Sequence, residues 1–356
     1  TVAPRTTTSP SQVAVASASR TITMVVLLSA VVTALAAGPF ADTGPSRVSA
    51  TLIEVAQRDV CSTLATVRTQ QHAQLPPAPI AQRAMLGAFT YGGIWRGIEP
   101  VLQLEADLGR RLDVVHWFTN WSQPYFPEMV AMASTAGRKA LISWQPHDQA
   151  IADIARGVYD EYIWSWADGV RESRVVVYLR PFPEMNGDWV PWNGQPALFR
   201  AAWRRMAAIF DLAGADNVRW VFSPNVTDSP RTEENRFELY YPGADVVDVL
   251  ALDGYNWGTT RAWTAWRSFE EVFTEGYDRI AALGDQGIWF AEMASSAEGG
   301  DKAAWVSDML ASTAFPRVEA LIWFDEHKEA DWRMVADDAV AHAFRAGTRA
   351  AELAAR

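Results

Sequence analysis

The chain has 356 residues, 49% of them hydrophobic, which is enough for one large domain or two ordinary ones with a filled core. A formal net charge of −11 argues against a nucleic-acid partner, because phosphate binding depends on basic patches. One cysteine excludes an internal disulfide, and the five histidines show no ligand-like spacing, so no metal site is predicted.

Residues 1–40 are predicted to be a disordered stretch followed by a secretory signal. Residues 1–19 are rich in Ser, Thr and Ala, and Arg20 precedes an apolar run from Ile22 to Ala37 that ends in small residues. A membrane span needs about 20 residues, so a signal is preferred to an uncleaved anchor. The protein is therefore expected to be secreted, or attached to the cell surface if the segment is retained.

Residues 41–83 are predicted to form a helical segment and a linker. Apolar residues recur at helical spacing within 46–72, and Cys61 among them is interpreted as an apolar filler. Leu75-Pro-Pro-Ala-Pro79 then has the composition of a stiff linker. The main domain is expected to occupy residues 84–356.

Strand-like and helix-like segments alternate along this main domain. Pro196 suits the first turn of a helix over 196–212, and Ser268 and Glu271 have the spacing of a capping box. Eight such strands predict an α/β fold, a closed (β/α)8 barrel. An open doubly wound sheet is the alternative, but no glycine-rich phosphate loop follows the first strand. The predicted strands are 85–90, 112–117, 140–144, 175–179, 218–222, 246–252, 287–291 and 318–324.

Carboxylates and aromatic residues are concentrated where the predicted strands end. In a barrel of this kind the active site lies at the C-terminal ends of the strands, so these side chains are expected to meet there. Aromatic faces suit the apolar faces of sugar rings. The predicted site residues are His116, Trp144, Arg180, Glu184, Trp189, Trp192, Asp253, Tyr255, Trp257, Glu292 and Trp323.

Glu184 and Glu292 are the strongest catalytic candidates. They follow the fourth strand and the seventh strand, which face each other across the mouth of an eight-stranded ring. Two opposed carboxyl groups are sufficient to hydrolyse a glycosidic bond if one is protonated and the other is ionised. Arg180 is expected to lie closer to Glu292 than to Glu184. The alternative for the fourth strand is a purely structural pair between Arg180 and Glu184.

Several other candidates have a structural alternative. His116 is equally consistent with a satisfied histidine that caps a strand, and Trp144 and Trp257 with packing residues that seal the barrel top. Asp253 is also consistent with a loop cap. Trp189 and Trp192 follow a Gly-Asp turn, which favours sugar stacking over the core.

Nine segments of the chain together form a recognisable pattern. In order they are Val115–Phe118, Ile142–Pro146, Ala155–Tyr162, Arg180–Trp192, Trp220–Pro224, Tyr241–Gly243, Leu252–Asn256, Phe290–Met293 and Ile322–Phe324. With this pattern the chain resembles glycoside hydrolase family 26, whose best-known members are secreted β-mannanases. The resemblance runs from about Gly87 to Trp332, which is nearly the whole predicted barrel.

The resemblance implies a retaining hydrolase that needs no metal or organic cofactor. It assigns Glu184 as the acid/base and Glu292 as the nucleophile. It assigns Trp189 as an aromatic at the cleavage site, and Asp253 with Tyr255 as a pair near the reacting sugar, of which the tyrosine orients the nucleophile. It assigns Trp323 as a platform under that sugar and His116 as a polar contact to it.

The chain departs from the family pattern beside both glutamates. Pro183 stands where the family usually has a histidine, and Met293-Ala294 replaces the usual aromatic-glycine pair. Proline offers neither a side-chain donor nor a backbone N–H. The expected partner is a polysaccharide, with β-1,4-mannan first and mixed-linkage β-glucan or β-xylan as alternatives. A non-catalytic carbohydrate-binding protein and a transglycosidase are the rival classes, and a monomer is expected.

Overall fold

The computed structural model describes residues 78–354. The predicted signal, the helical segment over 46–72 and Cys61 lie outside these residues. The described part begins with the 3-10 helix η1 (Ile80–Gln82), where Ile80 is buried in the core. Arg83 Nη2 donates to the carbonyl of Phe315 at 2.7 Å, so residues predicted as linker contact the barrel. No helix in the described part is long and apolar enough to cross a membrane.

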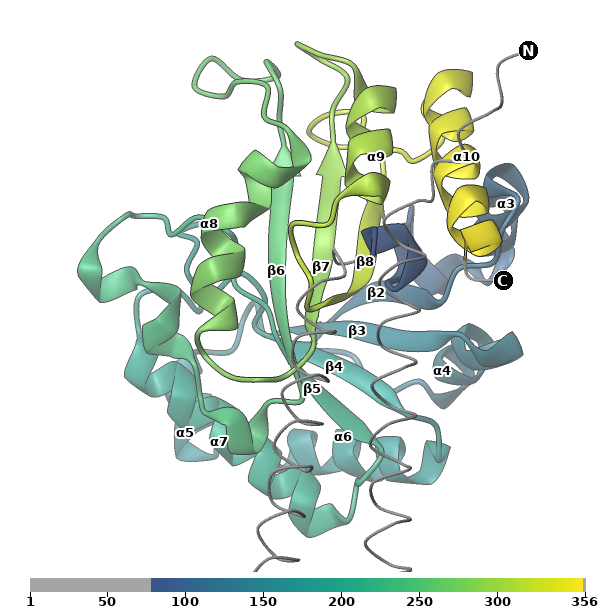
Figure 1. The fold of residues 1–356 in the computed structure, drawn as a ribbon. Helices are drawn as coiled ribbons and strands as arrows, with labels where there is room; N and C mark the ends of the chain where they lie inside the picture. The colour runs from purple at the N-terminus through teal and green to yellow at the C-terminus, as the bar shows by residue number, and fades with distance from the viewer. Residues whose placement is uncertain (1–77, 355–356) are drawn as a thin grey trace, which may run out of the picture. The chain divides into compact units, whose positions relative to one another are not determined.

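Eight parallel strands close into one barrel, each hydrogen-bonded to its neighbours in sequence and β1 to β8 (Figure 1). The prediction of a (β/α)8 barrel is confirmed. The strands are β1 (Met85–Thr90), β2 (Val114–Asn120), β3 (Lys139–Gln145), β4 (Val177–Pro181), β5 (Val218–Phe222), β6 (Val249–Asn256), β7 (Ile288–Ser295) and β8 (Val318–Asp325).

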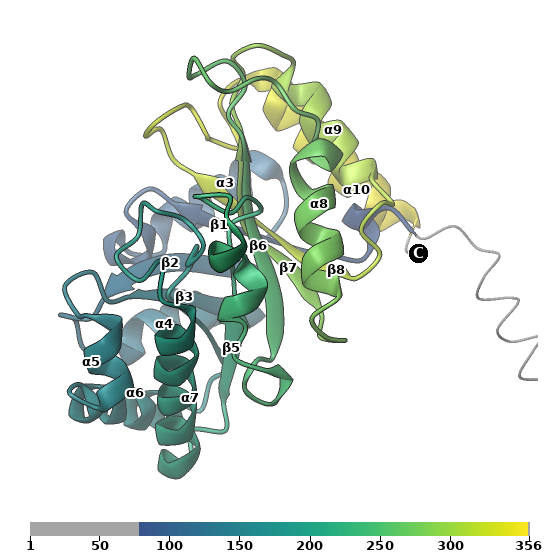
Figure 2. The same ribbon diagram turned by 90° about the vertical axis from the view of Figure 1, so that its left-hand side faces the viewer.

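Helices cover the outside of the barrel (Figure 2). Between β5 and β6 the described residues form three 3-10 helices, η4 (Glu233–Asn235), η5 (Phe237–Tyr240) and η6 (Ala244–Val246), in place of an α-helix. The α-helices are α3 (Glu99–Leu108), α4 (Pro127–Ser134), α5 (Ile151–Arg156), α6 (Asp160–Ser173), α7 (Pro196–Ala213), α8 (Phe269–Ala281), α9 (Lys302–Ala311) and α10 (Asp338–Ala354).

The two helix starts that the sequence predicts, at Pro196 and Ser268, are present in the structure. Pro196 occupies the first turn of α7, where its missing N–H costs no helical hydrogen bond. Ser268 caps α8: its side chain accepts from Glu271 N at 3.2 Å, and Glu271 Oε2 accepts from Ser268 N at 2.7 Å. This reciprocal pair satisfies two of the free N–H groups at the helix start.

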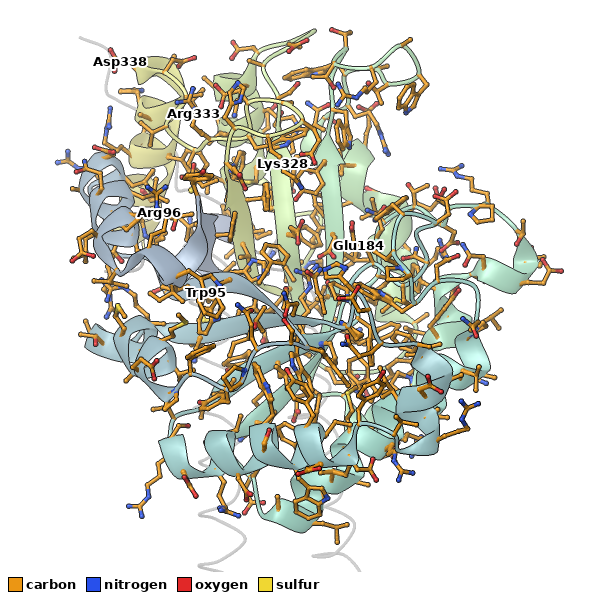
Figure 3. The ribbon with its side chains drawn as sticks, turned by 180° about the vertical axis from the view of Figure 1, so that it is seen from behind. Trp95, Arg96, Glu184, Lys328, Arg333 and Asp338 are labelled. Carbon is orange, nitrogen blue, oxygen red and sulfur yellow. The ribbon has the colours of Figure 1, made fainter. Side chains whose placement is uncertain are left out.

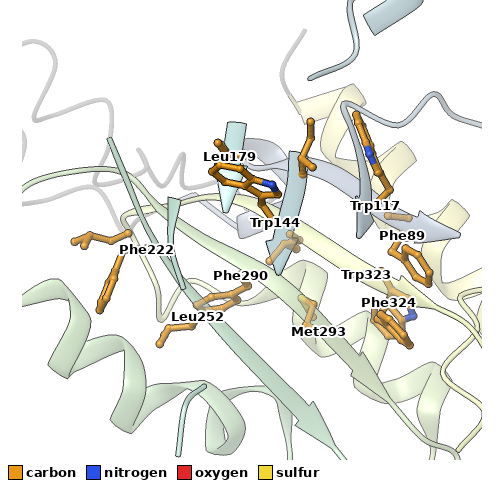
Figure 4. Close-up of a cluster of buried hydrophobic side chains, with 14 of the residues drawn as sticks. Phe89, Trp117, Trp144, Leu179, Phe222, Leu252, Phe290, Met293, Trp323 and Phe324 are labelled. Carbon is orange, nitrogen blue, oxygen red and sulfur yellow. The ribbon is translucent and has the colours of Figure 1, made fainter. Parts of the chain in front are cut away.

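Alternation along the strands divides the core into two buried clusters. Inward residues fill the barrel: Val114, Leu141, Val221, Val249, Ala251, Trp289, Ala291, Ala320 and Ile322. Outward residues pack against the helices, and this outer cluster includes Trp144, Phe290 and Trp323 (Figure 4). A strand residue therefore faces either the barrel interior or the helix layer, according to its parity.

Strand β7 breaks this alternation at the candidate nucleophile. Leu252 of β6 pairs with Phe290, but the next residue of β6, Asp253, pairs with Glu292. The register between β7 and β8 also shifts between Phe290 and Met293. This is the count expected of a β-bulge, which inserts one residue and re-aims the side chains beyond it. As a result Ala291 and Glu292 both face inward, whereas Met293 packs in the outer cluster.

Two strands at the site, β6 and β7, run further toward the barrel mouth than predicted. Strand β6 continues to Asn256 and β7 to Ser295, so Asp253, Tyr255 and Glu292 lie within strands instead of following them. The prediction ended these two strands at the last apolar residue. Ladder hydrogen bonds between backbones do not depend on apolar side chains, and the pairing of β6 with β7 continues through Asn256 and Ser295.

Candidate active site

Arg180, near the end of β4, lies at the centre of the polar groups in the barrel mouth. Its guanidinium donates to Glu292 Oε2 at 2.9 Å and to Ser143 Oγ at 3.0 Å, and forms an ion pair with Asp253. The side chain is completely buried. Burial disfavours its charge, but Asp253 and Glu292 outweigh that effect and raise the pKa of Arg180, which therefore stays protonated. The predicted proximity of Arg180 to Glu292 is confirmed.

Glu292 is held by a hydrogen bond on each oxygen. Tyr255 Oη donates to Oε1 at 2.6 Å, while Arg180 Nη1 donates to Oε2 at 2.9 Å. Its side chain retains 12% exposure, so it is accessible at the bottom of the mouth. The two donors fix the orientation of the carboxyl group, as a nucleophile requires.

The backbone of Glu184 is held in an uncommon conformation. Phe182 and Glu184 have φ angles of 51° and 56°, in the left-handed region that few non-glycine residues occupy. Glu184 N donates to Ser223 O at 2.8 Å, which ties the end of β4 to the segment after β5. Strained backbone of this kind persists only where its surroundings fix it, and it is frequent at active sites. Figure 3 shows Glu184 among the side chains near the middle of the molecule.

The carboxyl group of Glu184 differs from that of Glu292 in both partners and charge. Asn225 Nδ2 donates to Oε1 at 2.7 Å, and Trp189 Nε1 donates to Oε2 at 2.8 Å. Burial, and secondly the negative charge of Glu292, raise the pKa of Glu184 above its usual range, although the two donors oppose the shift. A raised pKa keeps a carboxyl group protonated and able to donate, as a general acid requires.

Trp189 combines a polar contact with an exposed ring. Its indole N–H is bound to Glu184, yet 52% of the residue is exposed. The ring lies against the backbone of Gly187, where an added Cβ would be 2.3 Å from the indole carbons. Glycine is therefore required at position 187 to let the indole approach Glu184. An exposed indole beside the acid is suited to contact a sugar face.

Tyr255, which holds Glu292, is itself packed against tryptophans. The ring of Trp332 lies 5.1 Å from that of Tyr255, and Trp332 meets Trp257 edge to face at 4.9 Å. Burial, followed by the charge of Glu292, raises the pKa of Tyr255 well above its ordinary value, so its phenol remains a donor. Trp257 is half-buried, with the Arg261 guanidinium 5.6 Å from its ring centre.

His116 lies below the mouth and is 1% exposed. Its Nε2 is 2.8 Å from Ser143 Oγ, and its ring packs against Phe89 and Phe118. Burial, and then the charge of Arg180, lower the pKa of His116 well below its usual value, so the ring is neutral. His116 is therefore a buried histidine whose Nε2 contacts Ser143 beneath Arg180. Its Nδ1 has no hydrogen-bond partner among the described residues, so the ring is not the fully satisfied one that the structural alternative expected.

Three of the predicted sugar-contacting tryptophans are core residues instead. Trp144 and Trp323 point outward from their strands into the helix layer, and Trp192 folds back so that its Nε1 donates to Pro183 O at 2.8 Å. All three are at most 1% exposed. Trp144 stacks on Trp121 at 4.6 Å. The predictions for these residues are wrong because each faces away from the mouth.

The structure adds four residues to the candidate site. Asn225 comes three positions after the last residue of β5, so the strand-end rule could have found it. Trp332 lies in the long segment after β8, and the sequence offers no rule that prefers it to Trp323. Ser143 and Ser223 complete the polar network: Ser223 Oγ donates to Asp253 Oδ1 at 2.7 Å.

Together these residues form two carboxyl groups of unlike character in one mouth. Glu292 accepts from a cation and a phenol, whereas Glu184 accepts from neutral donors and has a raised pKa. The negative charge of Glu292 contributes to the raised pKa of Glu184. This arrangement offers Glu184 as a general acid and Glu292, held by Arg180 and Tyr255, as a nucleophile.

Comparison with known proteins agrees with this arrangement. Residues 120–327 match the sequence model of glycosyl hydrolase family 26. Endoglucanase H of Acetivibrio thermocellus is 35% identical over 280 residues, which are 73% of this chain and 31% of that protein. A mannan endo-1,4-beta-mannosidase of Bacillus subtilis (strain 168) is 30% identical over 131 residues, 33% of this chain and 31% of the relative. The chain thus spans less than a third of the length of either relative.

Solved structures share the fold at low identity. An endo-beta-1,4-mannanase from Cellulomonas fimi superposes with a TM-score of 0.58 at 17% identity, covering 75% of this chain and 70% of that one. A beta-mannanase from Bacteroides ovatus gives a TM-score of 0.55 at 17% identity, covering 76% and 90%. At such identities the likeness concerns the barrel alone.

Proposed function

Because the chain belongs to glycosyl hydrolase family 26, we propose that it is a retaining glycoside hydrolase that cleaves β-linked polysaccharides internally. The observation that carries this proposal is the unlike environment of the two glutamates. Glu292 is bound by Arg180 and Tyr255, whereas Glu184 has a raised pKa. A site for sugar binding alone has no need of an opposed acid and nucleophile.

The proposed reaction has two steps. A carboxylate oxygen of Glu292 attacks the anomeric carbon, and the bond from that carbon to the leaving oxygen breaks while Glu184 gives the oxygen its proton. The sugar is then bound to Glu292 as an ester. Glu184, now ionised, takes a proton from water, and the water oxygen displaces Glu292 from the anomeric carbon. Arg180 and Tyr255 remain hydrogen-bonded to the carboxylate that leaves, which supports its negative charge.

The first proposed substrate is β-1,4-mannan. Among the curated relatives, the mannan endo-1,4-beta-mannosidases match this chain at 27–33% identity. Their matches cover 33–45% of the chain. An exposed Trp189 beside the acid suits a pyranose face of any of these polymers.

A β-glucan is the second proposed substrate, and a specific observation favours it. A relative that matches 73% of the chain is an endoglucanase. Pro183 also removes a polar side chain next to the acid. We propose further that the enzyme acts outside the cell, because polysaccharides of this kind do not cross membranes, and that it does so as a monomer.

The test compares reducing-end release from mannan, mixed-linkage β-glucan and xylan by the wild-type protein and by Glu292→Ala. Activity on one polymer that disappears in Glu292→Ala supports the proposal and selects the substrate. Early products should carry the β-anomer by NMR, whereas an α-anomer contradicts retention. Binding without turnover of any polymer would favour the carbohydrate-binding alternative. Transfer to an excess of acceptor sugar in place of hydrolysis would favour a transglycosidase.

A further inference from the structure

The segment between β8 and α10 is fixed to the barrel by two buried side chains. Lys302, the first residue of α9, donates from Nζ to the carbonyls of Asp331 at 2.9 Å and Arg333 at 2.8 Å. Trp323 Nε1 donates to the intervening carbonyl of Trp332 at 2.5 Å. The carbonyls of the three consecutive residues 331–333 therefore accept hydrogen bonds from the side chains of Lys302 and Trp323.

The next backbone group is held as well. Met334 N donates to Asp325 Oδ1 at 2.6 Å, and Asp325 is the last residue of β8. Trp332 N donates to Glu326 O at 3.0 Å, which closes the turn between them. Figure 3 shows Lys328 and Arg333 on this segment, which leads to Asp338 at the start of α10.

Lys302 is unusual because it is almost completely buried and, within residues 78–354, forms no ion pair with a carboxylate. The residue is 2% exposed, and its acceptors are backbone carbonyls. Its ammonium lies 5.7 Å from the centre of the Trp323 ring, while Asp325, Asp331, Arg333 and Asp337 are the charged groups that act on it. Burying an ammonium is costly unless it is hydrogen-bonded.

Residues 331–333 are also in contact with the residues around Glu292. Trp332, whose carbonyl and flanking carbonyls are held, packs its ring 5.1 Å from Tyr255. Tyr255 in turn donates to Glu292 at 2.6 Å. A continuous series of contacts therefore runs from Lys302 through Trp332 and Tyr255 to Glu292.

We propose that Lys302 is a positioning residue for catalysis: by fixing residues 331–333 it holds Trp332 against Tyr255, and so keeps the Tyr255 hydroxyl on Glu292. This inference rests on the proposed hydrolase function. It concerns chemistry after binding, so loss of Lys302 should lower kcat more than it raises KM. A tenfold loss of kcat is expected, about the effect of weakening one hydrogen bond to a charged group.

The test compares Lys302→Met with Lys139→Met as the matched control. Lys139 begins β3 at the opposite end of the barrel, where its ammonium lies 5.6 Å from the Tyr178 ring centre. Both variants lose a lysine that lies over an aromatic ring, but only Lys302→Met should change kcat. Combining Lys302→Met with Tyr255→Phe should cause no loss beyond that of Tyr255→Phe alone, because both act on one hydrogen bond.

A second readout does not depend on turnover. In protein labelled with ¹³Cζ-tyrosine, the Tyr255 resonance, assigned by its loss in Tyr255→Phe, should move in Lys302→Met at fixed pH and stay in place in Lys139→Met. If the wild-type protein cleaves no polymer, the proposed function fails. The resonance of Tyr255 still tests whether Lys302 maintains the contact between Trp332 and Tyr255. A lower Tm with kcat and the Tyr255 resonance unchanged would overturn the inference. If Lys302→Met does not fold, Trp332→Phe is expected to show the same kinetic and spectroscopic effects, and their absence would overturn it.

Discussion

Asn225, in the segment after β5, lies against Glu184 and donates to its Oε1 at 2.7 Å. This donor stabilises the ionised carboxyl group and so opposes the burial that raises the pKa of Glu184. Removing the donor in Asn225→Ala should raise the pKa of Glu184 further. The acid then stays protonated to higher pH, and the basic limb of the kcat/KM profile should move to higher pH.

The matched control for Asn225→Ala is Asn217→Ala at the other end of β5. Asn217 Nδ2 donates to the carbonyl of Val170 at 2.6 Å, so its loss should lower stability without moving the basic limb. A basic limb that stays in place, or moves to lower pH, in Asn225→Ala would contradict the assignment of Glu184 as the acid.

Removing the acid itself should be selective for the leaving group. Glu184→Ala should lower kcat on a polysaccharide by about 10²–10⁴-fold, because the leaving oxygen no longer receives a proton. An aryl glycoside with an acidic phenol needs no such proton, so its first step should be nearly unaffected. Azide should accelerate the second step and yield a β-glycosyl azide, identified by NMR. Equal losses on both substrates would rule out this role.

Removing the Tyr255 hydroxyl should affect the nucleophile. Tyr255→Phe keeps the ring against Trp332 but deletes the 2.6 Å hydrogen bond to Glu292. A hydrogen bond to a charged group contributes about 1.5–3 kcal/mol, so kcat should fall about 10–100-fold with a smaller change in KM. Steady-state kinetics on the preferred polymer would check this, and an unchanged kcat would contradict it.

Substitution of Trp144 should lower stability, whereas substitution of Trp189 should lower activity. Trp144 is fully buried, and Trp144→Ala should lower the free energy of unfolding by about 3–5 kcal/mol through the cavity it leaves. Trp189→Phe at the exposed rim should leave stability within about 1 kcal/mol, because it keeps an aromatic ring at an exposed position. It should, however, lower kcat/KM through loss of the N–H to Glu184. Denaturant unfolding and kinetics on both variants would test the contrast.

The eight strands were predictable because buried parallel strands consist of continuous runs of apolar and β-branched residues. Strands β1 and β5 were placed at their observed bounds. The upper ends of β6 and β7 were not, because the residues there are the polar site residues. The Glu184, Glu292 and Arg180 cluster followed from the rule that barrel sites lie at the C-terminal strand ends.

The tryptophans show what a strand-end rule leaves undecided. Trp323 and Phe324 are adjacent in β8, and parity alone sends Trp323 to the helices while Phe324 stacks on Phe89 at 4.8 Å. A single-residue error in parity exchanges core and site. Trp192 follows its turn but returns to the core through its bond to Pro183. Trp332 depends on the path of the segment after β8, which local sequence does not determine.

The bulge in β7 sets which face of the strand the nucleophile occupies. Deleting Ala291 would restore regular pairing and keep the glutamate on the inner face opposite Asp253, because the bulge places two residues of β7 against one of β6. If β7 kept Ala291 but paired regularly, without the bulge, the glutamate would instead point into the helix layer. In transplanting this site to an idealised barrel, the irregular register would have to be carried over together with the side chains.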